Sequence, residues 1–295
     1  MKIDRRGFTL SALAAGLAAS APILAGAQAR TKVRFAVTDI DGLESLQREF
    51  APFKEAIEKV SGLEVSFFPV SGRTAAVEAM AADQVDFVLT GPSEYVVFNA
   101  RLKAEPVVVW TRPNYFSSII VLEDSPAKAL ADLKGKKISL GEIGSTSQHL
   151  GPATILADAG LAYSRDYEPV FLKLNVAAEA LVRGDIAAIG MNQTHLERVR
   201  KAFPDRKFRS LGDGTPLPND VVVASPKVKP EVREAFRRAF AENADTLHAA
   251  IVQTKENAKF VGGKFLPTVS DKDYDMVRRM YVNIGIKEFT AFIGQ

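Results

Sequence analysis

The fold is decided by the stretch Lys137-Ile138-Ser139-Leu140, followed four residues later by Gly144-Ser145-Thr146-Ser147-Gln148-His149-Leu150-Gly151-Pro152. The first four residues form a short apolar run, which predicts a buried strand. The second part leads into an apolar helix over 153–159 that ends at Gly160. The carboxyl end of a strand therefore turns directly into the start of a helix, and the turn carries hydroxyl side chains.

Ser145, Thr146 and Ser147 fall at this helix start. The first turn of a helix leaves four backbone N–H groups without partners and carries about half a positive charge. Serine and threonine at this place can cap the helix. They can also leave the N–H groups and their own hydroxyls for an anion. The stretch by itself is compatible with either role.

Strands and helices alternate on both sides of this stretch. The apolar and amphipathic patterns predict strands over 32–37, 63–70, 85–89, 106–110, 115–122, 167–172, 186–191, 208–211 and 221–224. They predict helices over 46–60, 73–82, 96–101, 125–133, 176–182, 195–202, 230–250, 251–261 and 271–284. Such alternation is typical of an α/β fold with a parallel sheet and helices on both faces.

Two crossings divide the chain into lobes. The strand over 115–122 has no helix before it, and 212–220 is rich in Gly, Pro and Asp. We therefore expect one lobe from 30–114 and 212–295 and a second from 115–211. A weak internal repeat agrees, because the helix, turn and strand of 76–88 resemble those of 177–189. The predicted architecture is two α/β lobes, each a sheet flanked by helices, joined by two hinge crossings.

A ligand site is expected between the lobes. In open α/β sheets, ligands bind beyond the carboxyl ends of the strands. This rule brings together 38–41, 91–95, 144–148 and 191–193, and with them the helix starts at 72–74 and 174–175. Besides the three hydroxyl residues, the side chains predicted to bind ligand are Asp39, Arg73, Ser93, Tyr95, Gln148, Asn175 and Asn192.

Composition excludes several other kinds of chemistry. The net charge of the 295 residues is +3, of which residues 1–29 carry +2, so neither nucleic acid nor a membrane surface is an expected partner. The chain has no cysteine, which excludes disulfides, thiolate metal sites and a cysteine nucleophile. Its three histidines lack metal-ligand spacing, and no phosphate-binding glycine loop is present. We expect no metal and no cofactor.

His149 lies close to the serines, so a Ser–His hydrolase is one possible interpretation. Nothing in the chain resembles Gly-x-Ser-x-Gly. His149 falls in the first turn of the helix, where it is better explained as a neighbour of the cap or a residue lining the cleft. No catalytic residue is predicted.

Residues 1–29 have the three parts of a signal peptide. A basic start with Arg5 and Arg6 precedes an alanine-rich apolar run, and Ala27-Gln28-Ala29 offers a cleavage site. The paired arginines, followed by Gly7, Phe8 and Leu10, resemble the twin-arginine export signal; a general secretory signal is the alternative. The expected location is a bacterial periplasm, without stable insertion in the membrane.

Six stretches carry a resemblance to a known family: 77–80 with 85–87, Gly91-Pro92-Ser93-Glu94-Tyr95, 130–137, 144–147, Pro216-Leu217-Pro218-Asn219-Asp220, and 265–268 with 273–275. Their order and spacing resemble the periplasmic phosphate/phosphite/phosphonate-binding proteins of ABC transporters. The resemblance implies a type II periplasmic binding protein fold. It also implies that Ser145, Thr146 and Ser147 hold the phosphorus-bound oxygens and that Tyr95 lines the opposite lobe.

The sequence departs from this family pattern at three places. Arg73 stands where the family often has tyrosine, Asn175 where it often has histidine, and Asn192 with Gln193 where phosphonate binders often have acidic residues. We therefore hypothesise an anion without an amino group, held between Arg73 and the Ser145–Ser147 helix start. Sulfonates, carboxylates and other small solutes stay possible.

The resemblance implies a non-catalytic solute-binding protein that delivers a small anion to an ABC transporter permease with its ATPase. We expect it to be a monomer. A binding protein that senses its ligand for a receptor kinase is one alternative. An enzyme on the same fold, such as a hydrolase or a pyrimidine-synthesis protein, is the other.

Overall fold

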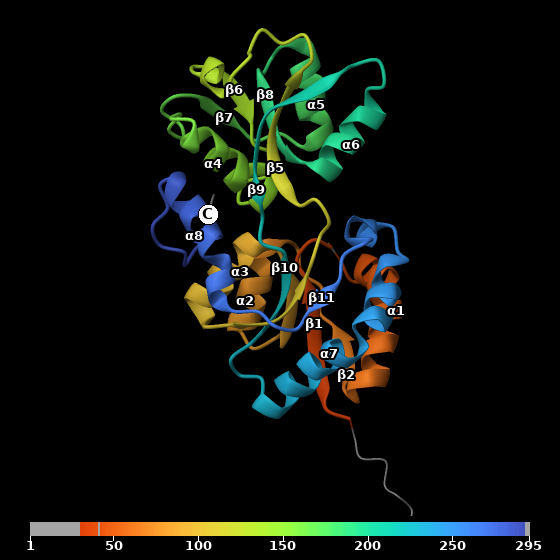
Figure 1. Ribbon diagram of the computed structural model, residues 1–295. Helices are drawn as coiled ribbons and strands as arrows, with labels where there is room; N and C mark the ends of the chain where they lie inside the picture. Colours follow the sequence, from red (N-terminus) through yellow and green to blue (C-terminus); the bar gives the residue numbers. More distant parts are fainter. Residues whose placement is uncertain (1–29, 41, 293–295) are drawn as a thin grey trace, which may run out of the picture.

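The computed structural model describes residues 30–40 and 42–292 and shows two α/β lobes, one above the other (Figure 1). The predicted signal peptide and Asp41 lie outside the described residues. Lobe 1 contains a six-stranded sheet and lobe 2 a five-stranded sheet, each between layers of helices. This is the fold class that the alternating pattern predicts.

The sheet of lobe 1 has the order β11-β4-β10-β3-β1-β2. Its strands are β1 (Lys32–Val37), β2 (Glu64–Phe67), β3 (Phe87–Thr90), β4 (Glu105–Trp110), β10 (Asp220–Ala224) and β11 (Phe265–Leu266). Strand β1 pairs in parallel with β2 and β3, while β10 lies antiparallel between β3 and β4. The carboxyl ends of β1 to β4 therefore lie at one edge, which faces lobe 2 (Figure 1).

Helices cover both faces of this sheet (Figure 1). One face carries α1 (Leu43–Ser61), α7 (Pro230–Val252) and the short η3 (Glu256–Phe260), which bury a phenylalanine-rich core. The other face carries α2 (Arg73–Ala81), α3 (Pro92–Leu102), η4 (Asp271–Tyr274) and α8 (Asp275–Asn283). Burial of large apolar side chains on both faces makes the sheet a rigid support for the loops at its edge.

The sheet of lobe 2 has the order β7-β6-β8-β5-β9. Its strands are β5 (Phe116–Leu122), β6 (Lys137–Ser139), β7 (Glu168–Val170), β8 (Ala188–Asn192) and β9 (Phe208–Pro216). Its helices are η1 (Leu130–Leu133), η2 (Thr146–Leu150), α4 (Gly151–Asp158), α5 (Leu174–Arg183) and α6 (Gln193–Ala202). Helix α4 continues directly from η2, so the two form one helical rod that begins at the serine segment.

Two sequence predictions about the sheets were wrong. Both sheets are mixed, because β5 and β10 run antiparallel to their neighbours. The strand predicted over 208–211 continues to Pro216, where it still pairs with Phe116 through two irregularities in register. The sequence pattern did not predict this extension because Gly212, Asp213 and Gly214 are poor strand formers. The return to lobe 1 therefore follows Pro216.

Helix α3 begins earlier than predicted. The sequence indicated a helix over 96–101, whereas the helix starts at Pro92 with Gly91 as its N-cap. Proline is favourable in the first turn, since it has no N–H to leave unpaired. Towards the other end of the chain, the helix predicted over 251–261 is reduced to η3, and the short strand β11 was missed. No helix in the described ranges is long and apolar enough to cross a membrane.

The carboxyl-terminal part of the chain also touches lobe 2. The Asn283 side-chain N–H donates to Thr154 Oγ1 at 3.2 Å, and Leu150 of η2 packs into the core between α3 and α8. Figure 1 shows α8 between α3 below and α4 above. The helical rod of lobe 2 therefore rests on lobe 1 at its amino-terminal end.

Candidate ligand-binding cleft

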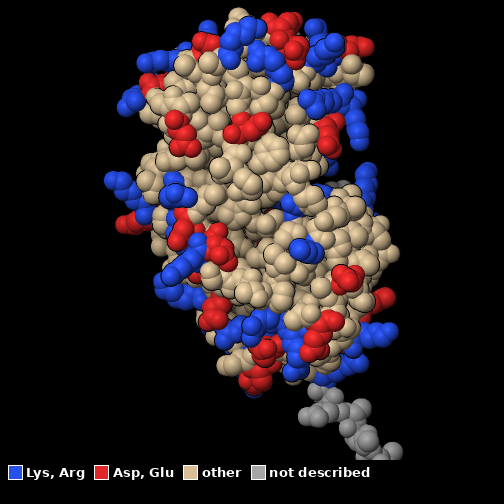
Figure 2. Space-filling view, in the orientation of Figure 1, with Lys and Arg blue, Asp and Glu red and all other residues tan. Residues whose placement is uncertain are grey.

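A cleft of about 900 Å³ lies between the two lobes. Its walls are loops that follow strand ends: after β1, β3 and β4 and at the start of α2 in lobe 1, and after β6 and β8 in lobe 2. Helix η3 contributes Lys259 and its neighbours to one end. In Figure 2 the surface is hollowed between the lobes on the right, with Lys and Arg side chains on both sides of the hollow.

The wall of lobe 2 begins at the serine segment. The left-handed backbone of Gly144, with φ of 81°, turns the chain into η2. Ser145 caps this helix, and its Oγ accepts from the Gln148 N–H at 3.4 Å. The N–H groups of Thr146 and Ser147 have no hydrogen-bond acceptor in the described part of the chain, and both residues line the cleft. The predicted cap and free donors therefore coexist.

Uncharged side chains continue this wall. The Asn192 side-chain N–H donates to Ser147 Oγ at 2.9 Å, while Asn192 Oδ1 caps α6 by accepting from the His195 N–H at 3.0 Å. Ser117 Oγ donates to the Ser147 carbonyl at 3.1 Å. These contacts fix the position of the Ser147 hydroxyl, because backbone and side chain are both held.

His149 supports the serine segment from behind. It is fully buried, and its Nδ1 accepts from the Gly144 N–H at 3.0 Å while Nε2 lies 3.0 Å from the Tyr163 hydroxyl. The first contact leaves the proton on Nε2, so the imidazole is neutral. Burial lowers the pKa of His149 to about 4. His149 therefore belongs to the support of the cleft wall and does not line the cleft.

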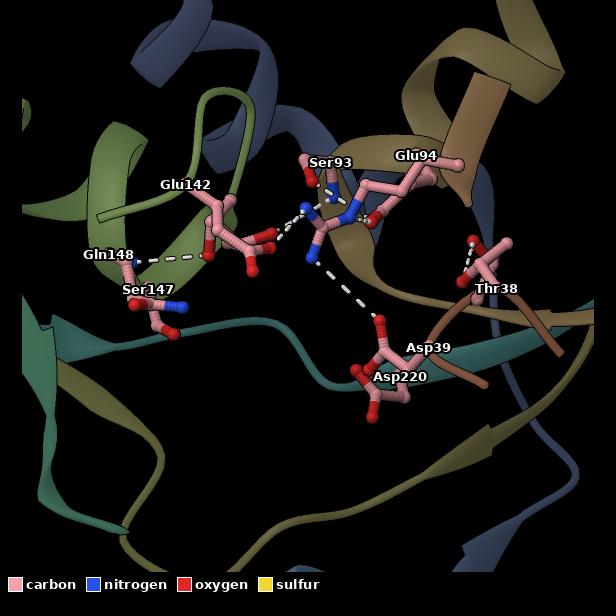
Figure 3. A network of polar contacts seen from close by, with 12 residues as sticks. Thr38, Asp39, Ser93, Glu94, Glu142, Ser147, Gln148 and Asp220 are labelled. Carbon is pink, nitrogen blue, oxygen red and sulfur yellow. Dashed lines mark hydrogen bonds and ion pairs between the residues drawn. The ribbon is translucent and has the colours of Figure 1, made fainter. Parts of the chain in front are cut away.

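The wall of lobe 1 is charged, and Arg73 is its centre. Its guanidinium forms ion pairs with Glu94, with Glu142 at 3.2 Å and with Asp39 at 3.7 Å. Figure 3 shows these three carboxylates converging on one guanidinium, with Glu142 coming from lobe 2. Glu94, followed by Asp39 and Glu142, raises the pKa of Arg73. The positive charge at the start of α2 is thus compensated by the protein.

A second ion pair lies on the floor of the cleft. Arg112 Nε donates to Asp220 Oδ2 at 2.7 Å, and both side chains are largely buried. The other oxygen, Asp220 Oδ1, is buried without a hydrogen-bond partner among the described residues. Burial raises the pKa of Asp220 against the opposing effect of Arg112. Asp220 lines the cleft, but its Oδ1 is enclosed by protein.

The end of the cleft next to η3 contains a third pair. Lys259 Nζ contacts Asp39 Oδ2 at 2.9 Å and, with Arg73, lowers the pKa of Asp39. His195 faces this end from lobe 2. Burial, with Arg198 and Arg112 nearby, lowers the pKa of His195 to about 4, and its Nδ1 has no partner within the described ranges. Asp39 contacts both Arg73 and Lys259, so it connects the two ends of the lobe 1 wall.

The structure brings together seven of the ten side chains predicted to bind ligand. Those that line the cleft are Asp39, Arg73, Ser145, Thr146, Ser147, Gln148 and Asn192. Ser93 is buried at the seam between the lobes, where its N–H donates to Thr146 Oγ1 at 3.1 Å. A lobe 2 side chain thus caps a lobe 1 helix.

The other two predicted side chains lie away from the cleft lining. Tyr95 is completely buried in lobe 1, with its hydroxyl donating to Asp271 at 2.8 Å and its ring against Tyr274. Asn175 is exposed on α5, which follows the edge strand β7. The rule that ligands bind beyond strand ends selected loops that line the cleft. It does not predict which way a side chain points from its loop.

Several charged residues of the cleft were missed. Glu94 and Asp220 lie in the stretches 91–95 and 216–220, and Arg112 follows the end of β4, where the strand-end rule also applies. Lys259 came from a segment that was interpreted only as helix. Among residues 30–40 and 42–292, no group of three or more His, Asp or Glu is arranged to hold a metal ion.

The sequence matches a known family model and is similar to known proteins. Residues 35–263 match the family model of phosphonate ABC transporter periplasmic substrate-binding proteins. The chain is 25% identical over 276 residues to the phosphate-import protein PhnD of Mycolicibacterium smegmatis, covering 84% of each chain.

Two solved structures share the fold. One is a binding protein component of an ABC phosphonate transporter from Pseudomonas aeruginosa, with a TM-score of 0.65, 18% identity and 86% of each chain covered. The other is the periplasmic aliphatic sulphonate binding protein SsuA from Escherichia coli, with a TM-score of 0.61 and 19% identity, covering 88% of this chain and 96% of that one.

Proposed function

Because this chain belongs to the periplasmic substrate-binding family of phosphonate ABC transporters, we propose that it binds a tetrahedral oxyanion of the phosphonate class in the interlobe cleft. Members of this family bind solutes for import, so the ligand is delivered to a membrane permease and its ATPase. The location is the periplasm, reached by way of the predicted signal peptide. The permease recognises the form of the protein in which the two lobes have closed on the ligand.

The observation that carries this proposal is the start of η2. The Thr146 and Ser147 N–H groups are unpaired in the described chain and lie on the cleft, beside the hydroxyls of Ser145 and Ser147. An oxyanion accepts hydrogen bonds from all four donors, and the helix dipole favours its negative charge. Hydrogen bonds to a charged group each contribute about 1.5–3 kcal/mol.

The family match favours a phosphorus oxyanion over a sulfonate. The family model describes phosphonate transporters, and the relative with 25% identity is a phosphate-import protein. The sulphonate binding protein shares only the fold, at 19% identity. We therefore place phosphonates ahead of sulfonates.

The role of Arg73 changes from the one expected from the sequence. Arg73 is bound by three carboxylates, so it is not a free cation for the ligand. In the proposed function it orders the lobe 1 wall opposite the serines, and the hydroxyl and N–H donors of lobe 2 hold the anion.

Isothermal titration of the mature protein with methylphosphonate, phosphate, phosphite and ethanesulfonate tests the proposal. We expect the phosphorus oxyanions to bind more tightly than ethanesulfonate. Ser147→Ala should weaken methylphosphonate binding by about ten-fold, the loss of about 1.4 kcal/mol. Ser210→Ala is the matched control, since the side chain of this exposed serine of β9 bonds to Asp213 and lies outside the cleft lining. Absence of binding by every anion would refute the proposal.

A further inference from the structure

The end of the cleft beyond Asp39 carries positive charge that the protein does not compensate. Arg198 of α6 and Lys255 before η3 both line the cleft, and neither forms an ion pair with any described residue. By contrast, Arg73, Arg112 and Lys259 are each paired with a carboxylate. The uncompensated cations therefore lie on the elements that carry His195 and Lys259, at this end of the cleft.

The size of the cleft also marks this end as a place for a ligand. The cleft encloses about 900 Å³, a volume typical of sites for ligands with many more atoms than a single oxyanion. An ion held only by Ser145 to Ser147 leaves this end unused.

Arg198 and Lys255 come from opposite lobes. Arg198 belongs to α6 of lobe 2, whereas Lys255 precedes η3 of lobe 1. An anionic group between them would attract both lobes at once, so its binding would favour the closed arrangement. Glu197 also lines this end and opposes such an anion. The Arg198 and Lys255 charges outnumber it.

We propose that the cleft takes an elongated ligand with two anionic ends, such as a phosphonate with a carboxylate tail. This inference rests on the proposed function, because the phosphonate end occupies the serine segment. The second anionic end lies between Arg198 and Lys255.

Paired ligands that differ only in the charge of the tail test this inference. Titration calorimetry would compare phosphonoacetate, 3-phosphonopropionate and 4-phosphonobutyrate, each with its neutral carboxamide counterpart. We expect at least one carboxylate to bind about ten-fold more tightly than its amide, an advantage that falls with rising salt. In Arg198→Gln/Lys255→Gln the advantage should drop to about two-fold or less, because affinity for the carboxylate falls more than affinity for the amide.

Two control variants separate local from general charge effects. Lys201→Gln removes an exposed cation from the same helix outside the cleft lining and should keep the advantage. Glu197→Gln should increase it. Equal binding of carboxylates and amides to the unmodified protein would overturn this inference and leave the proposed function intact. Binding of neither set would overturn the proposed function, and this inference with it.

Discussion

The two walls of the cleft expose different kinds of polar groups. The lobe 1 wall consists of charged side chains that neutralise one another: Arg73 with Glu94 and Asp39, Arg112 with Asp220, and Lys259 with Asp39. The wall of lobe 2 at the serine segment consists of hydroxyls, an amide and free N–H groups, with the exposed carboxylate of Glu142 next to it. Even the histidine behind it is neutral.

This difference indicates that the lobe 1 wall maintains the shape of the cleft, whereas the lobe 2 wall contacts the ligand. Paired charges give lobe 1 a fixed shape, because each ion has its partner within contact distance and removal of one partner is costly. The uncharged donors of lobe 2 have unused hydrogen-bonding capacity, so an anion can satisfy them without first breaking an ion pair. The strongest electrostatic groups of the cleft are therefore not the strongest candidates for ligand contact.

Breaking the buried pair on the cleft floor should have the largest effect. Arg112→Met leaves the Asp220 carboxylate buried without its cation, and we expect a loss of about 3–5 kcal/mol in the free energy of unfolding. Urea denaturation followed by circular dichroism measures it.

Two further variants make this test specific. Arg112→Met/Asp220→Asn removes both charges and should recover much of the lost stability. Arg233→Met breaks the exposed ion pair with Glu105 on the same lobe and should cost less than about 1 kcal/mol. Similar losses for Arg112→Met and Arg233→Met would contradict the supporting role of the buried pair.

Protonating the neutral histidine behind the serines should have an intermediate effect. The pKa of His149 is about 4 in the folded protein and about 6.5 in the unfolded chain. The unfolded state therefore takes up the proton first, so this contribution to stability is complete above pH 6.5 and is lost as the pH falls towards 4. Between pH 7 and pH 5 we expect a loss of about 2 kcal/mol from this residue.

Urea denaturation of the parent protein and His149→Asn across this pH range isolates the contribution. All other titratable groups are the same in the two proteins, so the difference between the two pH profiles belongs to His149. Parallel profiles would show that His149 is not held neutral in the folded state.

The smallest expected effect comes from the ion pair that joins the two walls. Glu142 is 61% exposed and contacts Arg73 across the cleft, so Glu142→Gln should change the free energy of unfolding by less than about 1 kcal/mol. It also removes a negative charge beside the serine segment. We expect affinity for methylphosphonate to rise by about two- to three-fold in titration calorimetry.

Glu168→Gln serves as the matched control, because its exposed pair with Lys137 lies at the start of the lobe 2 strands. A loss of affinity in Glu142→Gln would show that the ion pair between Glu142 and Arg73 favours binding by more than the negative charge of Glu142 opposes it.

Strand ends and helix starts could be predicted because they depend on local patterns. The serine segment was predicted at the cleft, and it lies there, because an apolar run followed by Gly and hydroxyl residues determines both the strand end and the helix start. Side-chain direction could not be predicted in the same way. Tyr95 follows a strand end as Arg73 does, yet its ring packs against Tyr274 and not in the cleft.

By itself, the sequence determined two α/β lobes, the segment of hydroxyls at a helix start and the loops that meet between the lobes, because periodicity and local capping are properties of neighbouring residues. Only the tertiary structure decided which charges compensate each other. Arg73 and Glu142 are separated by 69 positions in the chain, and Lys259 and Asp39 by 220. Ion pairing depends on distance in space, which no local pattern in the sequence encodes.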